Sequence, residues 1–333
     1  RATGVELQSG NVLDGSLVIL GLGVRANTQL AKDAGLTLGA TGGILVNEFQ
    51  QTSDPEIYAA GDVCEYLHGP SNIRMRVPLA GPANRAGRLA GQHAAVGNCQ
   101  AMAPVQGTAI VRLFELTAAM TGVTVGNAER CGLTVQSVTV IAGQHAGYFP
   151  GATPITLKLV FEIGTGRVVG AQAIGKDGVD KRIDVIATAM QFGATVHDLG
   201  TLDLAYAPPY GSAKDPVHQA AFTASNHLSG WGLVIDADAD LSGMQVIDVR
   251  TPGEVERVPL LECDGAVNIQ VDELRSRLTE LDDTRPTVVT CGVGIRGHVA
   301  QQILNQLGFE NVRNLSGGAT QRTRAIRAKR ELS

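Results

Sequence analysis

The run from Thr52 to Val63, TSDPEIYAAGDV, is the feature that most restricts how this chain can fold. Its Asp-Pro pair favours a turn, and the apolar stretch Ile57–Ala60 then favours a short strand. Gly61 has no Cβ, so a ligand can approach the backbone there. Asp62 follows where open α/β sheets bind ligands, beyond the carboxyl end of a strand. The run therefore predicts a strand that brings one carboxylate to a ligand, and a buried strand closed by a turn is the alternative.

Composition narrows the range of functions. The chain has 333 residues and a formal net charge of −5, and this length accommodates about two or three domains. We expect no nucleic-acid partner, because no basic stripe is present to neutralise phosphates, and no membrane partner, because no apolar run is long enough to span a bilayer. The five cysteines have neither CxxC nor metal-ligand spacing, which predicts no metal site and a reducing, cytoplasmic location. The basic end, residues 321–333, is predicted to be a solvated tail.

Short strands and helices are predicted on both sides of this run. Apolar alternation marks the strands, and small residues at helical spacing mark the longer helix. A Gly-Leu-Gly turn at 21–23 leads into a helix that Gly35 ends. We expect strands at 5–7, 17–20 and 44–46, and helices at 29–34 and 82–96.

Together, the Thr52–Val63 run and the helix at 82–96 resemble the second flavin-binding motif of the pyridine nucleotide–disulfide oxidoreductases. The resemblance implies that Asp62 hydrogen-bonds the ribityl and pyrophosphate region of FAD. It also implies that the N-terminus of the helix faces the flavin ring, where the helix dipole suits a reduced, anionic flavin. The cofactor-binding residues that the resemblance implies are Gly23, Gly61, Asp62, Leu79, Ala80 and Asn84.

Two signatures of that family are missing from the chain. It carries neither of the Gly-x-Gly-x-x-Gly fingerprints that the family has upstream of this run, and no cysteine precedes Cys64. Such a fingerprint supplies the turn and helix N-terminus that hold a dinucleotide pyrophosphate. We therefore expect the chain, which begins with Arg1, to be the C-terminal portion of a longer protein. FAD and NAD(P)H are then expected to bind only to the intact protein.

Residues 104–226 resemble the dimerisation domain of the same family. Apolar and polar residues alternate over 155–161, and a Gly-Thr-Gly turn precedes an apolar return at 168–173, which predicts an antiparallel hairpin. We expect strands at 108–116, 135–141, 155–161 and 168–173, a helix that opens at 119–122 and ends before Gly132, and a helix from 180 to Gly193.

The segment YAPPYGSAKDP, which begins at Tyr206, identifies a branch of the family. Its prolines exclude a helix and fix an extended backbone, so Tyr206 and Tyr210 are held in place as possible proton or hydrogen-bond donors. With HAGYFPGA at 145–152 and GVDKRIDVIATA at 178–189, the segment resembles the coenzyme A-disulfide reductase branch. In that branch, tyrosines of one subunit reach the active site of the other, which makes Tyr206 and Tyr210 catalytic candidates. A rigid aromatic contact between subunits, without catalysis, is the alternative.

A linker is expected at 227–242, where Gly, Ser and Asp residues surround Trp231. We expect the Trp231 ring to pack on a neighbouring domain. His218, which precedes this linker, lacks the context of a catalytic histidine and is predicted to be structural. A further domain is expected at 243–333, with strands at 246–250, 265–269 and 287–290 and helices at 272–281 and 298–307.

The predicted strand at 287–290 runs directly into the loop Cys-Gly-Val-Gly-Ile-Arg-Gly. Backbone N–H groups, the N-terminus of the next helix and the Arg296 charge can all stabilise the Cys291 thiolate, which is the nucleophilic form. A cysteine after a strand is commonly an inert core residue, but the Cys-x-x-Gly-x-Arg spacing favours a nucleophile. Cys291 and Arg296 are therefore catalytic candidates. The other residues of the loop, which we expect to bind the sulfur, are Gly292, Val293, Gly294, Ile295 and Gly297.

This loop resembles that of the rhodanese domain, whose cysteine carries a persulfide. Other rhodanese landmarks are matched at 248–250, 265–269 and 317–318. The resemblance implies that Cys291 takes sulfane sulfur from a donor and presents it to the flavin site. Arg296 would bind an anionic substrate or stabilise the loop.

The predicted fold class is an α/β and α+β multidomain protein. It comprises part of an FAD/NAD(P)-binding α/β region (1–103), an α+β dimerisation domain (104–226), a linker (227–242) and an α/β rhodanese-like domain (243–333). The resemblance implies a homodimeric, FAD-dependent NAD(P)H oxidoreductase that reduces a disulfide, persulfide or polysulfide, with small thiol species such as those of coenzyme A as substrates. The alternatives are a stand-alone rhodanese-type sulfurtransferase or sulfur-relay module, and a dimerisation scaffold without enzymatic activity.

Overall fold

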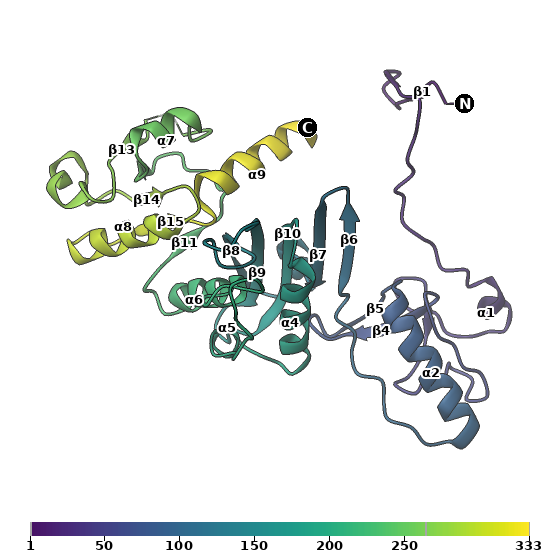
Figure 1. Ribbon diagram of the computed structural model, residues 1–333. Helices are drawn as coiled ribbons and strands as arrows, with labels where there is room; N and C mark the ends of the chain where they lie inside the picture. Colours follow the sequence, from purple (N-terminus) through teal and green to yellow (C-terminus); the bar gives the residue numbers. More distant parts are fainter. Residues whose placement is uncertain (1, 264, 333) are drawn as a thin grey trace. The chain divides into compact units, whose positions relative to one another are not determined.

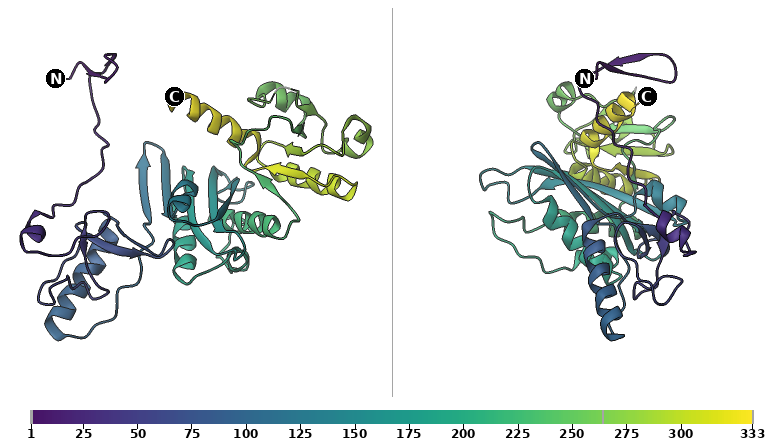
Figure 2. Two further views of the ribbon diagram at one scale, coloured as in Figure 1. Left: turned by 180° about the vertical axis from the view of Figure 1, so that it is seen from behind. Right: turned by 90° about the vertical axis from the view of Figure 1, so that its right-hand side faces the viewer.

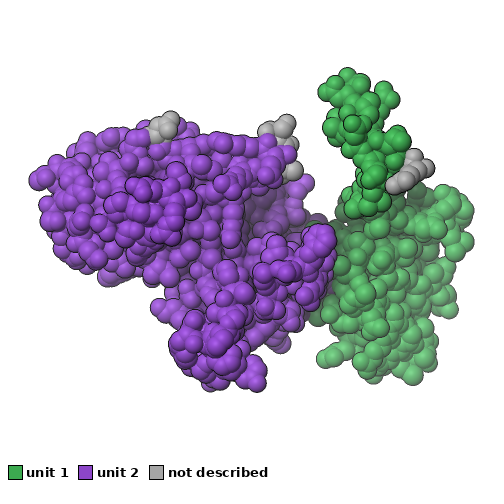
Figure 3. Space-filling model, turned by 45° about the horizontal axis from the view of Figure 1, so that its top comes forward, with its two compact units in different colours: residues 1–66, 74–103 green, residues 67–73, 104–333 purple. Residues whose placement is uncertain are grey.

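The computed structural model describes residues 2–263 and 265–332 and divides into two compact units (Figures 1 and 3). The first unit comprises the described residues up to Tyr66 together with Arg74–Ala103. The second comprises Leu67–Ile73 and the described residues from Pro104 onward. The mixed α/β and α+β multidomain architecture that the sequence predicts is confirmed. None of the helices described is both long and apolar enough to cross a bilayer.

The first unit contains a hairpin, a small sheet and a long helix (Figure 1). Strand β1 (Gly4–Glu6) pairs antiparallel with β2 (Val12–Asp14). The sheet has the order β3 (Ile44–Leu45), β4 (Cys64–His68) and β5 (Ile73–Arg76). Helix α1 (Gln29–Asp33) and helix α2 (Ala80–Val96) lie where the sequence predicts them.

Two predicted strands of this unit are wrong. Leu17–Leu20 forms no strand, and Leu17, Ile19 and Leu20 are more than three-quarters exposed. No described strand pairs with this segment, so its backbone groups lack the ladder partners that a strand requires. Residues 57–60 also form no strand, because only Tyr58 makes a bridge, to Gln51. Gly61 and Asp62 therefore precede strand β4 instead of following a strand.

The second unit is built first on an antiparallel sheet with the order β6-β7-β10-β9-β8. These strands are β6 (Ala109–Leu113), β7 (Leu116–Gly122), β8 (Val135–Gly143), β9 (Pro154–Glu162) and β10 (Val168–Gly175). The predicted hairpin at 155–173 is confirmed, and its inward residues Leu157, Leu159 and Phe161 are fully buried. The helix predicted to open at 119–122 begins later, at Val125, because 119–122 belongs to β7 and pairs with β10; its end before Gly132 is as predicted.

Helices cover one face of this sheet. They are α4 (Val179–Gln191), α5 (Val196–Gly200) and α6 (Pro216–Leu228), whereas α3 (Val125–Arg130) packs on Val135 and Val160 of the opposite face. The apolar side chains of α4 and α6 share one core with β8, β9 and β10, because these helices place Ile, Val, Ala and Met at helical spacing toward the sheet. In the right-hand view of Figure 2, α4 and α6 lie beneath the sheet.

A second, parallel sheet of the same unit has the order β11-β15-β14-β12-β13. Its strands are β11 (Val234–Ile235), β12 (Gln245–Asp248), β13 (Val267–Asn268), β14 (Thr287–Thr290) and β15 (Val312–Leu315), and its helices include α7 (Pro252–Arg257), α8 (Ile295–Gln306) and α9 (Gly318–Leu332). Val288 and Val289 face opposite sides of β14 and are both fully buried, as expected for a parallel strand covered on both faces.

The segment expected to be a linker contains regular secondary structure. Helix α6 continues to Leu228, and β11 lies within 227–242 as an edge strand of the parallel sheet. The Trp231 ring is 69% exposed, so the prediction that it packs on a neighbouring domain is wrong. The helix predicted at 272–281 is replaced by two short 3₁₀ segments, Leu274–Ser276 and Leu278–Glu280, which are separated at Arg277 by non-helical backbone angles.

The predicted solvated tail is helical in its described part, which belongs to α9; residues 327–331 are exposed as predicted, whereas Arg322 and Ile326 are buried, and Ser333 lies outside the described residues. Arg322, on this helix, is only 2% exposed. Its guanidinium donates to four backbone carbonyls, those of Ala237, Ala239, Leu261 and Glu262, at 2.9–3.0 Å. One arginine of this basic segment therefore joins α9 to two distant parts of the chain, 237–239 and 261–262.

The parallel sheet lies against the open face of the antiparallel sheet. The Thr139 amide donates to Ser316 Oγ at 2.7 Å, and the Arg324 guanidinium donates to Thr156 Oγ1 at 2.8 Å. Thr139 and Thr156 alternate with core residues of β8 and β9 and so point away from α4 and α6.

We predict that Arg322→Met destabilises the second unit by at least about 2 kcal/mol, because four buried carbonyls lose a charged donor. The matched control, Arg327→Met, removes an exposed arginine of the same helix and should be neutral. Trp231 is the only tryptophan of the chain, so its fluorescence in a urea titration reports on this region. Equal unfolding midpoints for the two variants would contradict the prediction.

Candidate functional site

Cys291 lies at the carboxyl end of β14, where the strand turns directly into helix α8. Its side chain is 1% exposed, and the Gly294 amide donates a hydrogen bond to its sulfur at 3.2 Å. Gly294 caps α8 with φ +105°, so the helix begins at Ile295, immediately beside the sulfur. The first amides of a helix have no acceptor within it, and its N-terminus carries a partial positive charge. The predicted strand–loop–helix cradle is therefore present around Cys291.

Glycines pack this loop closely against β15 and α9. A Cβ on Gly318 would lie 2.4 Å from the Cys291 carbonyl oxygen, and one on Gly297 would lie 2.2 Å from Asn314 Oδ1. The Ala319 amide donates to the Cys291 carbonyl at 2.8 Å, and Asn314 Nδ2 donates to the Gly294 carbonyl at 2.9 Å. Backbone packing therefore requires glycine at 297 and 318.

Arg296 points to a partner that the sequence analysis missed. Its Nη1 and Nη2 donate to Glu254 Oε2 and Oε1 at 2.9 and 2.6 Å. Glu254 lies on α7 and also accepts hydrogen bonds from the Thr251 amide and hydroxyl, each at 3.0 Å. Arg296 and these Thr251 donors lower the pKa of Glu254 to about 2. The Thr-x-x-Glu spacing of a capping box was the available sequence signal for this glutamate.

The Arg296 guanidinium also interacts with the Cys291 sulfur, although more weakly than with Glu254. The Glu254 carboxylate is the main cause that raises the pKa of Arg296. The free cation that the sequence predicts beside the thiol is therefore one half of an ion pair. The groups that can still stabilise a thiolate on Cys291 are the Gly294 amide, the start of α8 and the part of the Arg296 guanidinium that does not bind Glu254.

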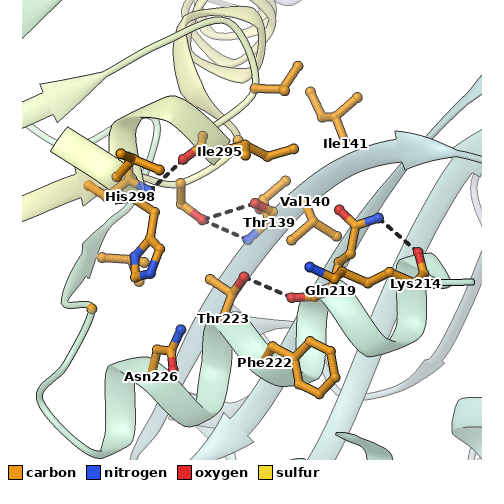
Figure 4. A pocket seen from close by; sticks show the side chains of 18 of the residues that line it. Thr139, Val140, Ile141, Lys214, Gln219, Phe222, Thr223, Asn226, Ile295 and His298 are labelled. Atoms are coloured by element: carbon orange, nitrogen blue, oxygen red, sulfur yellow. Dashed lines mark hydrogen bonds between the residues drawn. The ribbon is translucent and has the colours of Figure 1, made fainter. Parts of the chain in front are cut away.

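A cavity of about 800 Å³ lies behind this loop (Figure 4). Val293, Gly294 and Ile295 line it from the loop and α8, and His298 follows one turn later. Its opposite wall comes from β8 and α6, which contribute, among others, Thr139, Val140, Phe222 and Thr223. Asn314, which holds the Gly294 carbonyl, also borders the cavity.

The two candidate tyrosines are exposed. The side chains of Tyr206 and Tyr210 are 48% and 72% exposed. The Tyr206 hydroxyl lies 3.0 Å from that of Tyr148, a residue of the 145–152 segment that the sequence analysis did not select, and this hydrogen bond raises the pKa of Tyr148. No hydrogen bond among the described residues joins either candidate to the Cys291 loop. The tyrosines and the thiol are therefore separate features of this chain.

A buried ion pair holds the tyrosine segment in place. Arg182, 1% exposed, donates to Asp215 at 2.7 Å and to the Gln144 carbonyl at 2.6 Å. The Ala146 amide donates to the Gly211 carbonyl at 2.9 Å. These contacts tie the 145–152 segment to the 206–216 segment. His218 Nε2 hydrogen-bonds the Leu202 carbonyl at 2.8 Å, which is a structural contact.

The predicted flavin-binding residues lie in the first unit. Gly61 has φ +94°, and a Cβ there would meet no atom within 4 Å, so its backbone faces open space. The Tyr66 hydroxyl accepts from the Gly61 amide at 2.7 Å and donates to the Gly61 carbonyl at 3.0 Å. Burial is the main cause that raises the pKa of Tyr66, so its hydroxyl keeps the proton that this double contact requires. Asp62 is exposed.

The other predicted flavin-binding residues are Leu79, Ala80 and Asn84, near the start of α2, and Gly23, which lies far from them in the sequence. Leu79 caps α2, Ala80 is its first residue, and its first turn has no acidic side chain. Asn84 is exposed on this helix, and Gly23 lies in an exposed irregular segment. An open glycine backbone, an exposed carboxylate and a helix N-terminus fit part of a flavin site. Tyr66, which fixes Gly61, is the positioning residue that the sequence analysis missed.

Comparison with known proteins identifies three matching regions. Residues 1–87 match the family described as pyridine nucleotide-disulphide oxidoreductase, residues 108–216 match its dimerisation domain, and residues 235–324 match the rhodanese-like domain. A coenzyme A disulfide reductase of Staphylococcus epidermidis is 36% identical over 220 residues, which cover 66% of this chain and 50% of that protein. The chain therefore spans about half the length of the curated relatives it matches.

Two solved structures are similar over nearly the whole chain. The reduced CoADR-RHD of Bacillus anthracis is 41% identical with a TM-score of 0.92, and the match covers 98% of this chain and 58% of that one. An NAD-dependent persulfide reductase from A. fulgidus is 38% identical with a TM-score of 0.85, and the match covers 94% of this chain and 56% of that one.

We predict that Gly318→Ala destabilises the second unit by about 1–3 kcal/mol, because the added methyl group would overlap the Cys291 carbonyl. The control, Gly292→Ala, should change stability by less than about 0.5 kcal/mol, since its Cβ would meet only Arg296 Nη2, at 4.0 Å. Urea unfolding followed by Trp231 fluorescence measures both. If Gly292→Ala proved as destabilising as Gly318→Ala, the packing account of the loop would be wrong.

Proposed function

Because the chain belongs to the pyridine nucleotide–disulphide oxidoreductase family and carries a rhodanese-like domain, we propose that it works in sulfur reduction. The proposed reaction is the FAD-dependent, NAD(P)H-driven reduction of a disulfide, persulfide or polysulfide. The names of its relatives, a coenzyme A disulfide reductase and a persulfide reductase, support this reaction class. The single observation that carries the sulfur chemistry is the Cys291 loop.

In this proposal Cys291 takes up sulfane sulfur. The Cys291 thiolate attacks the outer sulfur of a donor R–S–SH, and a new Sγ–S bond forms as the S–S bond of the donor breaks. The electron pair of that bond leaves with the thiolate R–S⁻, so the step involves no net oxidation or reduction. The Gly294 amide, 3.2 Å from the sulfur, and the start of α8 stabilise the attacking thiolate of Cys291.

The other loop residues shape the cradle. Gly292, Val293, Ile295 and Gly297 carry the backbone around the sulfur, and Gly297 permits the close approach of Asn314. Of the two roles that the sequence left open for Arg296, the contacts with Glu254 favour stabilisation of the loop. Arg296 is then a positioning residue for Cys291.

The flavin would be held by Gly61, Asp62, Leu79, Ala80 and Asn84, with Gly23 as a further candidate. When bound, FAD supplies the two-electron chemistry that connects NAD(P)H oxidation to sulfur reduction. The open backbone at Gly61, the exposed Asp62 carboxylate and the positive end of α2 support these assignments. Tyr66 would keep the Gly61 backbone in its flavin-binding conformation.

We further propose a homodimer that acts on small thiol, disulfide or persulfide substrates of the coenzyme A type, in the cytoplasm. The match to the dimerisation domain supports the dimer, and the Staphylococcus epidermidis relative supports the substrate class. Tyr206 and Tyr210 are exposed, which an approach to the partner subunit's active site requires. The domain division 1–103, 104–226, 227–242 and 243–333 remains part of this proposal.

A stand-alone sulfurtransferase is less well supported. The solved relatives align over 94–98% of this chain, including its first unit, and a relay module would not need a flavin motif or a dimerisation domain. A scaffold without enzymatic activity would not need a thiol cradled by a helix N-terminus.

In the complete protein, Cys291→Ser should abolish persulfide-driven NAD(P)H oxidation and sulfur transfer to cyanide, because serine cannot carry sulfane sulfur. Flavin content and the reduction of coenzyme A disulfide should be unchanged. Cys131→Ser, a thiol outside the loop, is the control. Persistent sulfur transfer in Cys291→Ser would refute the role of the loop.

Tyr210→Phe should lower the rate of disulfide reduction by up to about 100-fold if the hydroxyl donates a proton, with the dimer intact. Tyr210→Ala should in addition weaken the dimer, measured by sedimentation. If Tyr210→Phe kept full activity while Tyr210→Ala lost the dimer, Tyr210 would be a packing residue without a catalytic role.

A further inference from the structure

Glu254 forms an ion pair with Arg296, the cation beside the Cys291 sulfur. Both of its carboxylate oxygens bind the Arg296 guanidinium, at 2.6 and 2.9 Å. The two side chains are 33% and 38% exposed, and the guanidinium also interacts with the Cys291 sulfur, so the pair lies beside the thiol and is partly open to solvent. A donor molecule that approaches Cys291 therefore meets an ion pair and not a free positive charge.

This arrangement disfavours anions. The bidentate face of a guanidinium is its strongest anion-binding surface, and here a carboxylate already fills it. The charges of Arg296 and Glu254 cancel, and a thiolate on Cys291 leaves a net negative site. A dianionic donor would have to displace Glu254 and also approach this negative sulfur.

Glu254 does not depend on Arg296 for its position. The Thr251 amide and hydroxyl hold its Oε2 at 3.0 Å each, as the capping box at the start of α7. An anion that took the guanidinium would leave the carboxylate in place beside it, and the two negative groups would repel each other. The pair is therefore a fixed feature beside the thiol.

We propose that Glu254 is a specificity-determining residue, which makes the Cys291 site accept sulfur from organic persulfides, whose reacting S–S group carries at most one negative charge, and reject donors with a dianionic reacting group such as thiosulfate. The inference rests on the proposed function of Cys291. In the favoured step, Cys–S⁻ and R–S–SH give Cys–S–SH and R–S⁻. In the disfavoured step, Cys–S⁻ and thiosulfate give Cys–S–S⁻ and sulfite, with the same bond changes and two more negative charges to accommodate at each stage.

The test compares two donors in the complete protein, the dianion thiosulfate and 2-hydroxyethyl persulfide, which carries at most one negative charge, with cyanide as acceptor. Glu254→Gln keeps an oxygen for the Thr251 donors but releases the charge of Arg296. We expect the KM for thiosulfate to fall about fivefold, the effect of roughly one exposed charge contact. The kcat/KM for the persulfide should not rise, because a loosened loop lowers the activity with both donors.

Glu256→Gln is the matched control, because it removes the same charge from an exposed position on the same helix; it should change neither donor. Glu254→Ala also releases Arg296 and repeats the measurement without the amide group that Glu254→Gln introduces. Glu254→Asp keeps the negative charge and should retain the wild-type preference between the two donors. An unchanged thiosulfate KM in both charge-removing variants, or equal changes for both donors, would overturn the inference. Loss of the proposed function is a separate outcome, recognised by sulfur transfer that survives Cys291→Ser.

Discussion

The hydrogen bond from the Gly294 amide to the Cys291 sulfur is the contact on which the chemistry of this chain depends. It exists because β14 ends at the cysteine and α8 begins four residues later, so the backbone must curl around the side chain. Gly294 takes a left-handed conformation, φ +105°, that other residues adopt only under strain. The Gly294 amide and the start of α8 are then already oriented toward the sulfur, so they need no reorganisation when its negative charge develops.

The surroundings of the loop serve the same geometry. Asn314 on β15 and Gly318 on α9 pack closely against the loop. Arg322 joins α9 by hydrogen bonds to the segments 237–239 and 261–262. Glu254 holds Arg296 beside the thiol. The tyrosine segment is a separate construction, held by the buried Arg182–Asp215 pair. Chemistry-bearing side chains are thus placed by buried polar contacts as much as by the apolar core.

The sequence predicted those features that depend on residues close together in the chain. The hairpin of β9 and β10 follows from alternation of apolar residues, and the Cys291 loop follows from a strand, closely spaced glycines and a helix. The strand predicted at 57–60 failed because a short apolar run does not show whether a neighbouring strand is available. Arg322 and Glu254 were missed because their partners lie 42 to 85 residues away, a separation that periodicity cannot reveal.

The central claim is that Cys291 carries sulfane sulfur within a reductase of the pyridine nucleotide–disulphide oxidoreductase family. The most direct measurement is peptide mass spectrometry of the complete protein after exposure to an organic persulfide, with the products trapped by an alkylating reagent. The account predicts a trapped persulfide on the peptide that contains Cys291, and its removal on addition of NAD(P)H. An unmodified Cys291 peptide, with sulfur found on another cysteine or on none, would contradict it.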